Sequence, residues 1–163
     1  MKTRWIILLL VAFCLPAVAQ KKAAPFDMET RLGEAVSLES TETPFALLYC
    51  NNPDCNICEE VSDSLSSQDV MQFVDARMLT IYSVCVAGDF DEWLNQADVP
   101  GRVEAVNKSM SIMAGEDYEF SSLPALFLID KNRTILLNDT TVAEIVEYLE
   151  KYMDNGEFSE SIF

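Results

Sequence analysis

The feature that most constrains this chain is a pair of cysteines, Cys55 and Cys58, that follows closely on an apolar segment. The segment from Phe45 to Cys50 is a continuous apolar run of strand length, the pattern of a strand covered on both faces. Residues 51–54 break the run, and apolar residues then recur at helical spacing as far as Leu65. The sequence therefore predicts a strand, a short turn and a helix whose entrance holds both cysteines.

Two cysteines with this spacing at a helix start are suited to thiol-disulfide exchange. Their sulfurs lie on adjacent turns, close enough to bond, and free backbone amides at the helix start stabilise the thiolate of the first cysteine. We expect Asp54 to cap this helix. In this interpretation Cys55 attacks a disulfide and forms a mixed disulfide, which Cys58 resolves by attacking Cys55. The predicted catalytic residues are Cys55 and Cys58.

The rest of the chain predicts alternating strands and helices. The further predicted elements are a buried strand at 78–86, a short helix capped by Asp89, a hairpin at 125–130 and 134–138, and a last helix opened by a Thr141–Glu144 capping box. Residues 102–122 mix a helix-like spacing with a polar loop pattern, and no detail is predicted there. The order of elements predicts an α/β fold with a central mixed sheet flanked by helices.

The first nineteen residues have the pattern of a secretory signal peptide. Lys2 and Arg4 precede an apolar stretch, and the small residues at 17–19 form a cleavage site, so the mature chain is expected to begin at Gln20. The apolar run of 5–19 is shorter than the roughly 20 residues that a membrane-spanning helix needs, which disfavours an uncleaved anchor. Export to the periplasm is the favoured localisation, with secretion and lipid anchoring as open alternatives.

Composition divides the chain into four regions: a signal peptide at 1–19, a polar leader at 20–43 whose apolar residues are too sparse for a core element, one domain at 44–153, and a loose tail at 154–163. The net charge of −16 makes nucleic acid an unexpected partner, because an acidic surface repels phosphate backbones and anionic lipid. Cleavage would leave four cysteines in a compartment where disulfides persist.

Three features together resemble the thioredoxin superfamily: the order of elements, the CNIC motif after a buried strand, and Leu123-Pro124 before the hairpin. The phrases NPDCNIC and YEFSSLPALFLID resemble secreted thioredoxin-like proteins of Gram-negative bacteria. The resemblance covers about 44–153 and implies a thioredoxin-like fold in which Pro124 is a cis-proline facing the cysteine pair. It also implies that the backbone of Leu123 pairs with an extended substrate segment. The implied partners are protein thiols and disulfides and an unidentified electron-donor protein, with no cofactor.

The chain departs from the usual pattern of that superfamily at the motif. Asp54 stands where a tryptophan is usual, and Asn56-Ile57 replaces Gly-Pro. Tyr49 falls where a buried proton-relaying acid is common, which leaves the proton acceptor for Cys58 unidentified. Strong oxidases of this fold usually carry a histidine in the motif, and this chain contains none. A reductase or isomerase-like role is therefore favoured over strong oxidation.

Other interpretations of the cysteines stay open. The 55–58 pair could be a structural disulfide in a non-catalytic thioredoxin-like binding module. Zinc bound by four cysteines is disfavoured because a single CxxC lacks a partner motif, and haem attachment because Glu59 stands where histidine is required. Cys50 and Cys85 each end a predicted strand, so they could be buried free thiols, a second disulfide or an electron relay.

Overall fold

The computed structural model describes residues 21–155. The predicted signal peptide at 1–19, Gln20 and residues 156–163 of the predicted tail lie outside this range. Within it, no helix is both long and apolar enough to cross a membrane.

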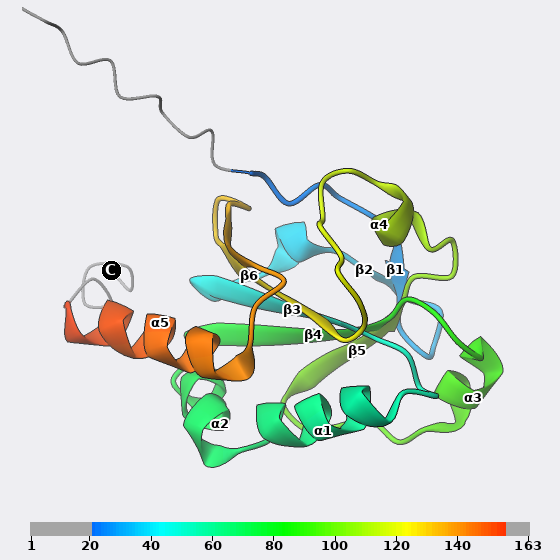
Figure 1. Ribbon diagram of the computed structural model, residues 1–163, viewed down its shortest axis with the longest axis horizontal. Coiled ribbons are helices and arrows are strands. Elements are labelled where there is room, and N and C mark those ends of the chain that lie inside the picture. The colour runs from blue at the N-terminus through cyan, green and yellow to red at the C-terminus, as the bar shows by residue number, and fades with distance from the viewer. Residues whose placement is uncertain (1–20, 156–163) are drawn as a thin grey trace, which may run out of the picture.

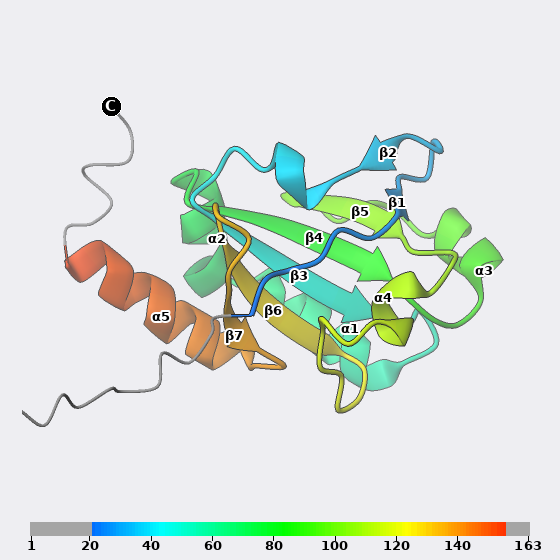
Figure 2. The same cartoon turned by 90° about the horizontal axis from the view of Figure 1, so that it is seen from above.

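A seven-stranded sheet forms the centre of the molecule, with the strand order β2-β1-β5-β4-β3-β6-β7 (Figure 2). β3, β4 and β5 are parallel, whereas the outer pairs on both sides are antiparallel. The bounds are β1 Met28–Glu29, β2 Ala35–Val36, β3 Phe45–Asn51, β4 Leu79–Cys85, β5 Arg102–Val106, β6 Ala125–Asp130 and β7 Ile135–Asn138. The predicted α/β fold with a mixed sheet is confirmed.

Helices α1 (Asn56–Leu65), α2 (Gln68–Asp75) and α5 (Val142–Asp154) lie together on one face of the sheet (Figure 1). Their buried residues, among them Leu65, Phe73 and Leu149, pack on Leu47 and Ile81 of the central strands. α5 begins at the predicted capping box, in which Thr141 and Glu144 each accept a hydrogen bond from the other's backbone N–H. The short helix α3 (Phe90–Asn95) begins at Asp89, as predicted.

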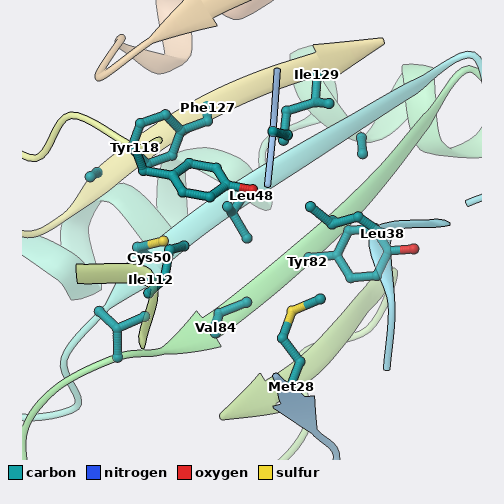
Figure 3. Packing of buried hydrophobic residues seen from close by; sticks show 14 of the residues in the cluster. Met28, Leu38, Leu48, Cys50, Tyr82, Val84, Ile112, Tyr118, Phe127 and Ile129 are labelled. Carbon is teal, nitrogen blue, oxygen red and sulfur yellow. The ribbon is translucent and has the colours of Figure 1, made fainter. Parts of the chain in front are cut away.

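The opposite face is covered without a long helix. Figure 3 shows this second cluster, in which Leu48, Cys50 and Val84 of the central strands pack against Tyr118 and Ile112. Ile112 belongs to the short helix α4 (Ser111–Ala114), and the 3-10 helix η1 (Leu38–Ser40) contributes Leu38.

The segment 21–43 is part of this fold. Ala23, Met28 and Leu38 are buried, and β1 pairs with β5 through Glu29 and Val106. The expectation that this segment has too few apolar residues for a core element is therefore wrong. The physical reason is that the edge of β5 supplies an unpaired strand, so one or two apolar side chains suffice to hold a short antiparallel partner.

Residues 102–122 form a strand and only one short helix. The helix-like spacing of Val103, Val106 and Met110 does not reflect a helix, because the first two lie in β5 and Met110 adopts a left-handed conformation before α4. β5 has an alternating pattern instead, with Val103 and Ala105 on one face and Arg102 and Glu104 on the other.

Candidate active site

The turn that leads from β3 into α1 is fixed by Asn52. Its side-chain Oδ1 accepts the backbone N–H of Asp54 at 2.9 Å, and its carbonyl accepts the N–H of Cys55 at 3.2 Å. Gly88, in the loop after β4, has φ of +90°, and a Cβ there would collide with the Asn52 side chain. The loop after β4 therefore presses on this turn and limits where Cys55 can lie.

Cys55 itself is the N-cap of α1. Its sulfur accepts the backbone N–H of Cys58 at 3.2 Å, and its side chain is half-buried. The prediction that Asp54 caps the helix is wrong, because the Asn52 turn places Asp54 one residue too early. The contact from a free N–H at the helix start is the one expected to stabilise a thiolate.

Cys58 lies one turn further on and is buried. Burial, followed by a hydrogen bond to Cys55, raises the pKa of Cys58 to about 12. The Tyr49 hydroxyl donates to the carbonyl oxygen of Cys58 at 2.6 Å, which fixes this turn of α1 to β3. Both thiols are free. The arrangement pairs a half-exposed cysteine with a buried one.

Leu123 and Pro124 lie at the same end of the sheet as this turn. Their peptide bond is cis, as the resemblance implies, and both side chains are half-buried. The next residue, Ala125, pairs with Cys50 near the end of β3. The substrate-binding role of Leu123 and Pro124 stays a prediction.

Cys50 and Cys85 do not form a second pair. Cys50 is opposite Val84, and Cys85 is opposite Asn51, so the two cysteines are offset by one residue on neighbouring strands. Their side chains therefore point to opposite faces of the sheet. Cys50 belongs to the cluster of Figure 3, whereas Cys85 packs with Trp93 on the other face. Of the three alternatives, this arrangement fits buried free thiols and excludes a disulfide between them.

A cavity of about 420 Å³ opens beside the two sulfurs, between α1, α3 and the ends of the central strands. Its polar lining includes Asn51, Ser83 and Glu104, which the sequence analysis did not single out. Leu123 and Pro124 do not line it. The sequence does contain a pattern that points to Glu104. Charged and apolar residues alternate in Arg102–Val106, which predicts a strand with one polar face.

Arg31, from the β1–β2 loop, holds α3 as the wall of this cavity. Its Nε donates to the Trp93 carbonyl at 3.1 Å, its guanidinium lies 4.5 Å from the Trp93 ring centroid, and it forms an ion pair with Asp98. Glu92 of α3 faces Asp54, and a hydrogen bond and repulsion from Asp54 raise the pKa of Glu92. The segment predicted as a leader thus helps to build the site.

Among residues 21–155, no group of three or more histidine, cysteine or acidic side chains is placed to hold a metal ion.

No protein-family model matches the chain, and no curated protein matches its sequence. Solved structures do resemble it. The C-terminal domain of a Bacteroides fragilis protein is 28% identical with a TM-score of 0.74, over 80% of this chain and 96% of that domain. A thioredoxin-like protein from Bacteroides caccae is 28% identical with a TM-score of 0.73, over 82% of this chain and 49% of that protein. The chain thus spans about half the length of the second protein.

The thioredoxin domain of a thiol-disulfide oxidoreductase from Bacteroides vulgatus also superimposes. Its TM-score is 0.64 at 18% identity, over 83% of this chain and 99% of that domain, so this likeness speaks for the fold alone.

Proposed function

This chain belongs to the thioredoxin superfamily, and from that premise we propose that it is a thiol-disulfide oxidoreductase that acts on protein disulfides through Cys55 and Cys58. The likeness to a protein named thioredoxin-like, at 28% identity, supports a general thiol-redox role, and the oxidoreductase domain from Bacteroides vulgatus shares the fold. The substrate, the catalytic residues and the direction of electron flow are our proposal.

One observation carries the proposal: a half-exposed sulfur caps the helix, and a buried sulfur lies one turn below it. The N–H of Cys58 at 3.2 Å stabilises negative charge on Cys55 Sγ, so this sulfur is the nucleophile. A purely structural disulfide needs neither accessibility of one sulfur nor a hydrogen bond aimed at it. The asymmetry therefore favours exchange chemistry.

The reaction proceeds in two displacements. The Cys55 thiolate attacks one sulfur of the substrate disulfide, forms a mixed disulfide and releases the other sulfur as a thiolate, which takes up a proton. Cys58 then loses its proton and attacks Cys55 Sγ, which releases the second substrate thiol and leaves a Cys55–Cys58 disulfide. Two electrons pass to the substrate, and an electron-donor protein with a reduced dithiol returns the pair to its starting state.

A reductase or isomerase-like role agrees better with the site than strong oxidation. A strong oxidant needs a stabilised reduced form, which means thiols that ionise easily. Burial instead raises the pKa of Cys58 to about 12, so its thiolate is disfavoured. Oxidation to the disulfide removes that buried thiol, which favours electron donation to substrate.

The decisive experiment measures turnover of insulin disulfides with a dithiol reductant. We expect the wild type to accelerate reduction and Cys55→Ser to show only the background rate. Cys50→Ala is the matched control, because it removes a cysteine from the opposite face of the sheet and should retain turnover. Wild-type turnover that survives Cys55→Ser would exclude the proposed nucleophile.

If the wild type shows no exchange, and both wild type and Cys55→Ser bind a partner equally, the chain is a non-catalytic binding module.

We also propose that the protein is exported after cleavage before Gln20. Amino-terminal sequencing of the protein from its native cell tests this: a mature chain that begins at Gln20 supports export, and a chain that retains residues 1–19 contradicts it.

A further inference from the structure

A row of polar side chains runs across the sheet beneath α1, from the redox pair to β5. Tyr49 on β3 is opposite Ser83 on β4, and Ser83 is opposite Glu104 on β5. Residues in such register share one face of the sheet. Polar groups at this depth are unusual next to the apolar residues Leu47 and Ile81 of the neighbouring row, so their presence calls for a reason.

The row borders the cavity that also contains the resolving cysteine. Cys58, Tyr49, Ser83 and Glu104 all line the same space of about 420 Å³. A cavity of this size with several hydrogen-bonding groups has room for water. Water in this space would link Cys58 to Glu104, which no direct contact joins among the described residues.

Glu104 is the carboxyl group in this cavity whose bonding is incomplete. Among residues 21–155, its Oε1 is buried without a hydrogen-bond partner. Burial raises the pKa of Glu104, and hydrogen bonding to Ser83 and attraction to Arg102 oppose the rise. A carboxylate oxygen that is buried without a hydrogen-bond partner lowers the stability of the fold. Burial also raises the proton affinity of the group toward that of a thiol.

Arg102 does not neutralise Glu104 by a direct ion pair within the described chain. Its guanidinium donates instead to the carbonyl and hydroxyl of Ser62 on α1 and to the hydroxyl of Ser66, the C-cap of α1. Arg102 thereby ties β5 to the helix that carries Cys58 and holds Glu104 at a fixed position relative to it.

The charged and titratable groups around Glu104 come from every element packed on it. They are Arg102 on β5, Arg31 in the β1–β2 loop, Asp98 after α3, Tyr49 on β3, and Cys55, Cys58 and Glu59 on α1. Tyr49 is not available as a proton acceptor, because its hydroxyl donates to the Cys58 carbonyl and burial raises its pKa further. Glu59 is exposed to solvent. Glu104, which is half-buried and has one buried carboxylate oxygen, is thus the less exposed of the two acids that line the cavity.

We propose that Glu104 accepts the proton of Cys58, through water in the cavity, when Cys58 attacks the mixed disulfide. This inference rests on the proposed function and names the proton acceptor that the sequence leaves unidentified. Glu104 occupies β5, two strands away from β3, where Tyr49 occupies the position at which a buried acid is common in the superfamily.

Each bond and each proton in the attack of Cys58 on the mixed disulfide is accounted for. The Cys58 sulfur forms a bond with Cys55 Sγ, the bond between Cys55 Sγ and the substrate sulfur breaks, and the substrate leaves as a thiolate. The Cys58 proton passes to the Glu104 carboxylate and then to the departing thiolate or to solvent. An acceptor is needed because burial raises the pKa of Cys58, so its thiolate is scarce at neutral pH.

The test isolates the resolving step. Cys55 is loaded with thionitrobenzoate as a mixed disulfide, and its release by Cys58 is followed by absorbance from about pH 5 to about pH 9. In the wild type the release rate should rise with pH through the ionisation of Glu104. Glu104→Gln should lose that inflection and release thionitrobenzoate about 100-fold more slowly near neutral pH. The difference between the two rates should shrink at high pH, where hydroxide deprotonates Cys58 directly.

Two variants keep the test specific. Glu60→Gln removes the same charge from an exposed position of α1 outside the cavity lining and should keep the wild-type profile. Glu104→Asp should recover part of the pH-dependent rate. Urea unfolding of each variant confirms that it is folded before release is measured.

The outcomes separate the two proposals. A Glu104→Gln profile that follows the wild type over the whole range overturns the proton-acceptor role while exchange itself stands. Wild-type protein that releases no thionitrobenzoate at any pH removes the oxidoreductase function and this inference with it.

Discussion

Two pairs of cysteines lie near the same end of the central strands, and they differ in how their two members are placed relative to each other. Cys55 caps α1 and Cys58 lies one turn further on, where its N–H contacts the sulfur of Cys55. Cys50 and Cys85 are on adjacent strands, yet they point to opposite faces because their register differs by one residue. Closeness in topology therefore does not bring two sulfurs together, whereas helical spacing does.

The environments of the two pairs differ in the same way. Cys55 is half-exposed and accepts a hydrogen bond from an N–H at the helix start, while Cys50 and Cys85 are fully buried. Burial raises the pKa of Cys50, and it raises that of Cys85 to about 11. Burial raises the pKa of Cys58 as well, so what separates the two pairs is the half-exposed Cys55, whose sulfur contacts the backbone N–H of Cys58. The comparison predicts that the first pair carries exchange and the second pair carries only packing.

The largest expected difference between the two pairs is in insulin turnover when one cysteine of each pair is replaced by serine. Cys58→Ser should lower insulin turnover by at least about 100-fold, because a held intramolecular nucleophile acts at an effective concentration of about 10⁵ M or more. It should also accumulate a mixed disulfide at Cys55, visible as a shifted band on a non-reducing gel. Cys85→Ser should leave turnover near the wild-type rate. A Cys85→Ser variant that traps the same intermediate would show that the second pair takes part.

The sequence alone predicts those parts of the structure that a local pattern of residues determines. β3 follows from an uninterrupted apolar run, α1 from the helical spacing after the motif, and the start of α5 from the Thr141–Glu144 capping box. The place of Cys55 and Cys58 at the start of α1 follows from the motif after the apolar run, whereas the cis bond at Pro124 was implied only by the resemblance to the thioredoxin superfamily.

The sequence does not predict those parts of the structure that depend on pairing between distant segments. Met28 enters the core only because β5 offers an edge 77 residues later, since Glu29 pairs with Val106. The faces of Cys50 and Cys85 depend on a one-residue register that no local pattern reveals. Glu104 reads as a surface residue in isolation, and its importance appears only when Ser83 and Tyr49 lie in the same row.

A smaller effect, on the free energy of unfolding, is expected when Cys50 or Cys85 is replaced by serine. Cys50→Ser buries a hydroxyl in the apolar cluster of Leu48 and Val84, where Cys50 has no hydrogen-bond partner among the described residues. It should lower the free energy of unfolding by about 1–3 kcal/mol.

Cys85→Ser should cost less than Cys50→Ser. The Cys85 sulfur donates to the Ala87 carbonyl at 3.3 Å, and a serine hydroxyl can keep that bond. Urea unfolding of both variants under reducing conditions measures the difference. Equal losses would mean that the two faces of the sheet treat a buried polar group alike.

The smallest expected effect is the contribution of the Cys85 thiol to the pH dependence of stability. The pKa of Cys85 rises from 9.0 to about 11 on folding, so between these values the unfolded chain has lost a proton that the folded chain retains. The free energy of unfolding contributed by Cys85 is therefore fully present below pH 9 and falls as the pH rises toward 11. From about pH 8 to about pH 10, replacing Cys85 with alanine should reduce the alkaline loss of stability by about 1 kcal/mol. The measurement is urea unfolding of wild type and Cys85→Ala at both pH values with reductant present. Parallel curves would mean that Cys85 ionises in the folded protein as easily as in the unfolded chain, which would contradict the inference that burial holds this thiol neutral.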